Sequence, residues 1–425
     1  MSNDNDPAAQ FAKAIKDAGL ELNGLPIMDG LLHRLPVASD KGSERSGAYV
    51  GHLEGRKPGG YIQNFKTGEK INWKADGSTP EFTPAERARF AIEAAQRRKE
   101  RDAAKAEEYD KTAAAAQSLW KESPLANAAN AYCKAKGIQH PGASGLRVVP
   151  SSVSPECATH GIKIVRTAKD AQETRSTDPE ARVFKAGDLL IPGKDLRGKI
   201  WTLQSINPYF KSLMKGGRKH GLFASAGEKP LYGASSSTPL VIAEGYATAD
   251  TVSRLLGQSV IVAFDSGNLD AVTRELRKQF PERTIFYAAD NDHEAPTKMD
   301  QFGKPMPNVG LVSANEAAVK YGCGVMAPPF EPGDKGSDWN DLAAIKGDAV
   351  AKRIIGDSMI GAKLEADGNL ASIKANAIID GDKGMLATLK KTVVESFSRH
   401  FKAGELNKQQ PTIKNASHER GGFEI

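Results

Sequence analysis

The segments PLVIAEGYATADTVSRLLG at 239–257, SVIVAF at 259–264 and TIFYAAD at 284–290 form the most regular part of this 425-residue chain. Each contains a short apolar run, and amphipathic stretches of roughly ten residues separate the runs. Buried strands that alternate with helices predict a parallel sheet with right-handed crossovers. A further helix and strand are expected at 309–322 and 323–329. We therefore predict an α/β fold in which helices flank a parallel sheet.

Acidic residues stand where these strands end. Glu244 closes the first apolar run, Asp265 closes the second, and Asp290 closes the third with Asp292 two positions on. Ligands of parallel sheets gather at the carboxyl ends of the strands, and neighbouring strands lie about 4.8 Å apart. If their strands are adjacent, Glu244 and the Asp290/Asp292 pair converge on one or two Mg²⁺ (or Mn²⁺) ions, which prefer carboxylate oxygens. The alternative is that these aspartates form turns and cap helices.

Another acidic turn occurs in GSDWNDLA at 336–343. Asp338 is a candidate metal ligand there, or else the N-cap of the helix that follows. Asp341 is a weaker candidate, since an exposed first-turn acid is common in helices.

Positive charge is concentrated just before the acidic segment. The whole chain has 58 Lys and Arg against 52 Asp and Glu, a net charge of only +6. Residues 196–227 contain six Lys or Arg and no acid, and glycines and aromatic residues accompany the cations. Such a run is typical of phosphate binding, although most basic turns simply face solvent. We predict that it binds nucleotides or template DNA, and the candidate residues are Lys211, Lys215, Arg218 and Lys219.

Four motifs in the acidic region resemble the Toprim domain of primases carried by conjugative plasmids and related phages. They are EGYATAD at 244–250, AADNDH at 288–293, NVG at 308–310 and DWNDLA at 338–343. The resemblance covers about a quarter of the chain and implies that Glu244, Asp290 and Asp292 hold the catalytic metals. Asp250 and Asp265 match the family pattern less closely. The basic segment at 188–223 also resembles the stretch that precedes Toprim in these primases.

The resemblance implies a DNA primase that makes short RNA primers on single-stranded plasmid or phage DNA by metal-dependent nucleotidyl transfer. Its partners would be the single-stranded DNA template and ribonucleoside triphosphates, with a replicative helicase or polymerase as a further partner. Two alternatives remain open: a Toprim nuclease that uses the same acids, and a non-catalytic escort protein that binds single-stranded DNA.

Composition excludes several other classes of protein. No uncharged apolar run approaches the roughly 18 residues of a membrane span, and MSNDNDPAAQ does not resemble a signal peptide, so we expect a cytoplasmic protein without membrane contact. Cys133, Cys157 and Cys323 are too far apart for a disulfide framework or a zinc knuckle. No GxxxxGK[ST] occurs, which excludes a fused helicase motor in this chain.

The remaining sequence suggests how the chain is divided. TPAE at 83–86 predicts the start of a long charged helix, expected as a solvated spacer. AKDAQETRSTDPEAR at 168–182 is expected to be a loop. In the N-terminal part, Tyr49, Tyr61, Phe65 and Trp73 either stack on bases or form a small core. The predicted parts are a β-rich module at 1–80, a linking helix at 81–122, an α+β basic subdomain at 123–236, the Toprim domain at 237–345, a helical region at 346–401 and a disordered tail at 402–425.

Overall fold

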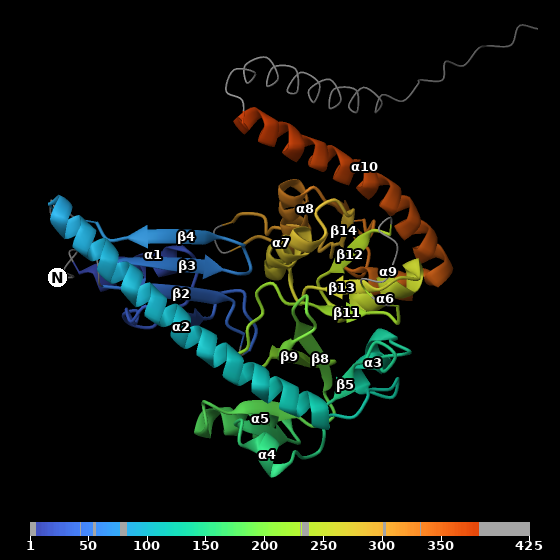
Figure 1. Cartoon of the computed structure of the whole chain (residues 1–425), viewed down its shortest axis with the longest axis horizontal. Helices are drawn as coiled ribbons and strands as arrows, with labels where there is room; N and C mark the ends of the chain where they lie inside the picture. The colour runs from blue at the N-terminus through green and yellow to red at the C-terminus, as the bar shows by residue number, and fades with distance from the viewer. Residues whose placement is uncertain are drawn as a thin grey trace, which may run out of the picture. The chain divides into compact units, whose positions relative to one another are not determined.

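The computed structural model (Figure 1) describes residues 6–42, 44–53, 57–76, 83–229, 231, 238–300, 303–331 and 333–381. Met1–Leu370 forms one compact unit and Ala371–Ile425 a second. The finer division into six parts stays a prediction. The expected tail, the helical region beyond 381 and residues 232–237 around the predicted boundary at 236/237 lie outside the described residues.

A five-stranded sheet occupies the region where a parallel sheet is predicted. Its order is β11-β13-β12-β14-β15, and the last four strands run parallel. The edge strand β11 (Ala224–Ala226) pairs antiparallel with β13, so the sheet begins before the predicted boundary at 237. The parallel strands are β12 (Leu240–Ala243), β13 (Val260–Val262), β14 (Ile285–Ala288) and β15 (Gly324–Met326).

Helices cover both faces of this sheet (Figure 1). Because side chains alternate along a strand, Val241 packs on one face and Ile242 on the other. The face of Ile242 is covered by α7 (Leu269–Gln279) and α8 (Val309–Tyr321). The face of Val241 is covered by α6 (Tyr246–Leu256), α9 (Trp339–Lys346) and the first part of α10 (Asp348–Gly381). Two 3-10 turns, η1 (Ser266–Asn268) and η2 (Ala295–Thr297), follow β13 and β14.

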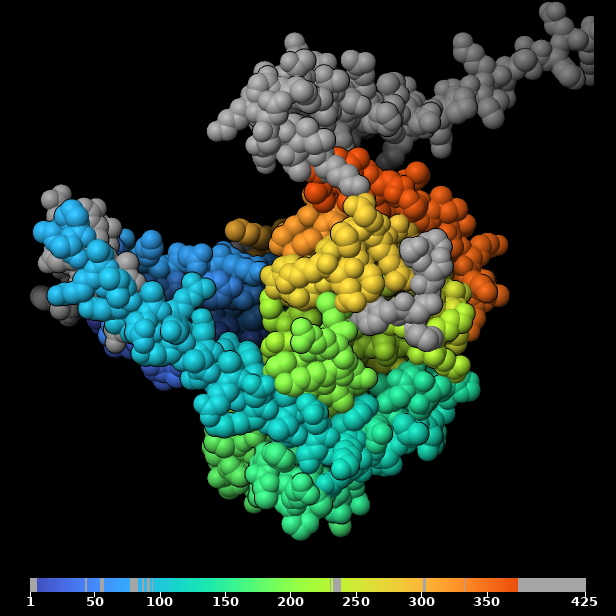
Figure 2. Space-filling model, viewed as in Figure 1, coloured from blue at the N-terminus to red at the C-terminus, as the bar shows by residue number. Residues whose placement is uncertain are grey.

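The long charged helix α2 (Pro84–Glu122) begins where TPAE predicts. The expectation of a fully solvated spacer is wrong for its last turns. Ala115, Ala116 and Leu119 are completely buried there, and α2 packs against β9 (Ile200–Asn207). In Figure 2, α2 (cyan) runs beside the light-green segment that contains β9. The end of α2 is therefore part of the core of the basic region.

The basic region contains an antiparallel sheet in the order β10-β9-β8-β5 and a separate parallel pair, β6 with β7. The predicted loop at 168–182 is wrong. It contains α5 (Ala168–Thr177), which starts with a capping box in which Thr167 and Asp170 bond each other's backbone N–H. The remaining elements are α3 (Ala131–Lys136), β5 (Arg147–Val148), α4 (Pro155–Ala158), β6 (Ile162–Val165), β7 (Arg182–Lys185), β8 (Leu189–Lys194) and β10 (Phe210–Leu213).

The N-terminal strands form a four-stranded meander packed on a helix, α1 (Pro7–Asp17), that the sequence reading missed. Phe11 of α1 lies 5.9 Å from the ring of Tyr49 and 4.7 Å from that of Trp73. Gly60 permits this approach, since a Cβ there would lie 2.3 Å from Phe11. Tyr49 and Trp73 are thus part of the core. The strands are β1 (His33–Leu35), β2 (Gly47–His52), β3 (Gly59–Asn64) and β4 (Lys70–Lys74).

No helix among the described residues combines the length and the apolar character needed to cross a membrane.

Candidate active site

Glu244 and Asp290 follow two strands that lie side by side. β12 and β14 are parallel neighbours in which Ala243 pairs with Ala288. Glu244 comes directly after the paired Ala243, and Asp290 comes two residues after Ala288. The adjacency on which their convergence depends is therefore present. Asp265 follows β13, which lies on the other side of β12.

Gly310, in the first turn of α8, brings that helix against both acids. A Cβ built on Gly310 would lie 2.7 Å from Oε1 of Glu244 and 3.1 Å from the backbone carbonyl oxygen of Asp290. The first of these distances is too short for any real contact, so a side chain here would displace the carboxyl. The NVG segment thus includes a residue whose lack of a side chain leaves room for the Glu244 carboxyl.

Burial and mutual repulsion raise the pKa of both carboxyls. Burial and, to a smaller extent, the negative charges of Asp290 and Asp265 together raise the pKa of Glu244 to about 8. Burial likewise raises the pKa of Asp290 to about 7, with Asp338 and Asp292 contributing. Oε1 of Glu244 is buried without a hydrogen-bond partner. An ionised carboxylate in such a place is unfavourable unless a positive charge joins it.

The surrounding acids differ in how they are held. Asp292 is exposed, whereas Asp338 is mostly buried and accepts a hydrogen bond of 2.8 Å from the backbone N–H of Asp341. Asp338 is thus the N-cap of α9 and also a charge that acts on Asp290. The charges that act on Asp250 are instead those of Arg254 and His140.

The donor set suits a hydrated divalent cation. Within the described ranges, no three acidic, His or Cys side chains form a complete ligand cluster. Mg²⁺ commonly keeps several waters and takes only one or two carboxylates from the protein. The buried, unpartnered oxygen of Glu244 beside the high-pKa carboxyl of Asp290 fits that mode of binding.

Two asparagines that the sequence reading missed hold the turn between the aspartates. The side chain of Asn308 donates to Oδ1 of Asn291 at 2.8 Å and accepts from the backbone N–H of Asp292 at 3.2 Å. Asn308 is also the N-cap of α8. The signal was Asn308 itself, the first residue of NVG and a common N-cap residue, directly before a predicted helix. Asn308 therefore couples the position of Asp292 to that of Gly310.

The four predicted cations have different surroundings. The positive charge of Lys211 lowers the pKa of both Glu244 and Asp290. Lys219 forms an ion pair with Asp265. Lys215 pairs with Glu180 at 2.8 Å.

Arg218 stacks 4.3 Å from the ring centre of Trp201, and its Nε is buried without a hydrogen-bond partner. It lines a cleft of about 740 Å³ to which α2, the turn after β8 and α7 also contribute. The ring of Trp201 also receives Lys199 at 3.7 Å, and its Nε1 donates to Asp195 at 2.8 Å. Two further basic residues in the cleft come from elements that sequence reasoning did not assign to the site, Lys105 of α2 and Arg274 of α7, whereas Arg197 and His220 belong to the predicted basic run at 196–227.

Comparison with known families finds a match over residues 239–349 to the Toprim domain. Among curated proteins, a DNA primase TraC of Escherichia coli is 32% identical over 395 residues, which is 91% of this chain and 33% of that protein. A second DNA primase TraC of Escherichia coli is 32% identical over 400 residues, 90% of this chain and 24% of that protein. The chain thus spans a third or less of the length of these relatives.

Among solved structures, the DnaG primase catalytic domain bound to single-stranded DNA matches with a TM-score of 0.38 and 14% identity over 59% of this chain and 82% of that one. The zinc-binding and RNA polymerase domains of the Aquifex aeolicus primase match with a TM-score of 0.37 and 16% identity over 84% of this chain and 86% of that one. These TM-scores indicate only partial structural similarity between this chain and the two primase structures.

Proposed function

We propose that this chain, which matches the Toprim domain over residues 239–349 and is similar to the DNA primases TraC, is itself a DNA primase. It would synthesise short RNA primers on single-stranded plasmid or phage DNA in the cytoplasm, as a polymerase of the nucleotidyltransferase class. The observation that carries this proposal is the pair of half-buried carboxyls with raised pKa values, Glu244 and Asp290, at the ends of adjacent parallel strands.

Glu244, Asp290 and Asp292 would hold a divalent cation, Mg²⁺ or Mn²⁺, with Asp338 beside them. When bound, such an ion polarises phosphoryl oxygens and lowers the pKa of an attacking hydroxyl. Because the pKa values of Glu244 and Asp290 are raised, the metal-free site holds protons near neutral pH. Binding of the ion therefore requires these carboxyls to release protons, and affinity should rise with pH.

Glu244 can act in either of two ways once a 3′-hydroxyl is bound. It can remain a ligand, or its unpartnered Oε1 can accept the proton that the hydroxyl loses. Lys211 supplies positive charge beside the same carboxyls, where the phosphates of an incoming ribonucleoside triphosphate would lie. Arg218, Lys215 and Lys219 would contact template or triphosphate farther along the basic run.

The test is incubation of the purified chain with a single-stranded DNA circle and labelled ribonucleoside triphosphates, with Mg²⁺ or with chelator. We expect short labelled RNA only in the presence of the metal, and none from Asp290→Asn. Asp270→Asn is the matched control, because that partly exposed aspartate pairs with Lys320 on the outer helices. Shortened DNA without RNA products would contradict the proposal and favour a nuclease. Binding of DNA with neither reaction would favour an escort protein.

A replicative helicase or polymerase is the expected partner that would use the primers. Co-purification of such a protein with the tagged chain tests that expectation separately.

A further inference from the structure

Two adjacent aromatic rings are displayed on the surface at the turn between β9 and β10. Tyr209 is 96% exposed and Phe210 is 53% exposed. Together they present an apolar surface to water, which is unfavourable unless a ligand covers it. We call Tyr209 and Phe210 the aromatic turn.

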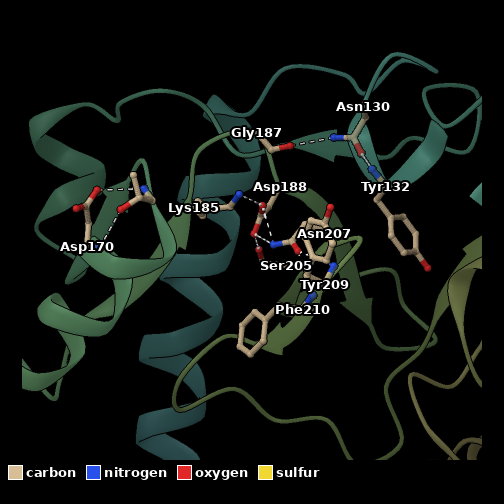
Figure 3. A network of polar contacts seen from close by, with 11 residues as sticks. Asn130, Tyr132, Asp170, Lys185, Gly187, Asp188, Ser205, Asn207, Tyr209 and Phe210 are labelled. Atoms are coloured by element: carbon tan, nitrogen blue, oxygen red, sulfur yellow. Dashed lines mark hydrogen bonds and ion pairs between the residues drawn. The ribbon is translucent and has the colours of Figure 1, made fainter. Parts of the chain in front are cut away.

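Hydrogen bonds to the side chain of Asn207 fix the backbone of the aromatic turn (Figure 3). Oδ1 of Asn207 accepts the backbone N–H groups of both Tyr209 and Phe210 at 3.0 Å. Nδ2 of Asn207 in turn donates to both carboxylate oxygens of Asp188 at 3.1 Å. Asp188 is buried, and it also accepts from Ser205 at 3.1 Å and lies 3.6 Å from Lys185.

This network orients Asn207 and thereby fixes the backbone that carries the two rings. A buried carboxylate needs several partners, and here three side chains supply them, Lys185 from β7 and Ser205 and Asn207 from β9. The ring of Phe210 points away from the network in Figure 3. Rings on a pre-ordered turn lose little conformational entropy when a ligand binds.

The charges near the aromatic turn indicate the kind of ligand. Arg175 of α5 lies 5.9 Å from the ring centre of Phe210. The next residue, Lys211 of β10, is exposed and places a second cation beside the turn. Residues 196–227 contain no acid. Exposed rings flanked by cations are typical of surfaces that stack unpaired bases and neutralise phosphates.

We propose that the aromatic turn, flanked by Arg175 and Lys211, stacks unpaired bases of the single-stranded DNA template. This inference rests on the proposed primase function and assigns to it a template contact that the basic residues alone do not provide. Lys211 would contact the phosphate beside a stacked base. Stacking on a ring is independent of base identity, so the contact would not itself select a sequence.

The test measures the affinity of the full chain for a fluorescein-labelled oligodeoxynucleotide by anisotropy over a range of salt concentrations. We expect Tyr209→Ala and Phe210→Ala each to weaken binding roughly 10-fold, the range of one stacked base. Neither ring releases counterions, so the slope of log K against log salt should not change. Lys211→Ala should lower that slope by about 0.7, as for one phosphate contact on a single strand.

Tyr209→Trp and Tyr209→Leu separate stacking from a general apolar contact. Tyr209→Trp should keep the affinity, with tryptophan fluorescence quenched on binding, whereas Tyr209→Leu should bind as weakly as Tyr209→Ala. Val319→Ala, which trims a 64% exposed side chain on α8, should bind as the wild type does. Because Tyr209 is almost fully exposed, its variants should keep the wild-type melting temperature.

Wild-type affinity in both alanine variants would overturn the inference while leaving the primase function intact, provided that the wild type binds DNA and makes primers. Full affinity of Tyr209→Leu would also overturn it and would favour a protein partner for this surface. If the wild type makes no primers, the proposed function fails, and a ring-dependent affinity would then describe a DNA-binding protein only.

Discussion

Glu244 and Asp290 are the residues on which the proposed chemistry depends, and each is stabilised in its protonated form by burial. A conservative change at Glu244 tests the charge without changing the shape. Glu244→Gln should lower primer synthesis by roughly 10²- to 10⁴-fold, the range for loss of an acid–base group. Affinity for single-stranded DNA, measured by anisotropy, should not change. A parallel loss of binding would mean that Glu244 is structural.

The raised pKa values also predict how stability depends on pH. In chelator, the folded protein holds a proton on Glu244 up to about pH 8, whereas the unfolded chain releases it near the usual value of 4.5. The folded state therefore binds more protons across this window, and its stability must fall as pH rises. Melting temperatures between pH 5.5 and 8 should fall more steeply for the wild type than for Glu244→Gln. Equal slopes for the two proteins would contradict the assignment.

Gly310 offers a test of the close contact between α8 and the acids. An alanine inside a helix is normally more favourable than glycine by about 1 kcal/mol. At Gly310 the added Cβ would instead lie 2.7 Å from Oε1 of Glu244. We expect Gly310→Ala to lower primer synthesis at least 10-fold, because a carboxyl displaced by even about 1 Å loses its alignment.

Gly361→Ala on α10 is the matched control for that change, since nothing lies within 4 Å of its added Cβ. It should keep full synthesis and gain slightly in thermal stability. Equal activity of Gly310→Ala and Gly361→Ala would show that the contact at α8 has no role in catalysis.

At the scale of elements, α2 combines two different segments in one helix. Its first part is exposed, as Ile92 with 70% exposure illustrates, whereas Leu119 near its end is fully buried. Leu119→Ala should therefore destabilise the protein by about 2–5 kcal/mol, the cost of a cavity in a packed core. Ile92→Ala should change stability by less than about 0.5 kcal/mol. Denaturant titration of both variants measures the difference, and similar values would mean that α2 is a spacer throughout.

At the scale of the whole molecule, we expect binding of single-stranded DNA to depend less on the net charge than on which Lys and Arg side chains are not already engaged in ion pairs. Lys215 and Lys219 are already paired with Glu180 and Asp265, whereas Lys211 has no ion pair in the part of the chain that the structure describes. Neutralising Lys211 and Arg218 together should lower the salt slope of single-strand binding by about 1.4, as for two phosphate contacts. Neutralising Lys215 and Lys219 should lower it by less. The reverse order would mean that DNA displaces the internal ion pairs.

Many of the strands and helices could be predicted from the local sequence pattern. Strands β12, β13 and β14 each have a continuous apolar run, and helices α6 and α8 end at Gly257 and Gly322. The spacing of apolar residues and the terminal glycines are therefore sufficient to identify these elements. α5 was missed although Thr167 and Asp170 form a capping box, because the polar composition of the segment outweighed the cap. The sequence did not predict α1, because the apolar face that includes Phe11 is covered only by strands that lie farther along the chain.

The sequence by itself determined the alternation of strands and helices, the acids at the strand ends and the concentration of cations before them, since these depend on neighbours along the chain. Tertiary structure alone decided that β12 lies beside β14, that α8 reaches Glu244 through Gly310, and that Lys215 pairs with Glu180 while the charge of Lys211 acts on the acids. The physical reason is that pairing of strands, burial of a carboxyl and partners of an ion depend on residues far apart in sequence. A pKa or an ion pair is a property of the space around a group, and only the folded chain specifies that space.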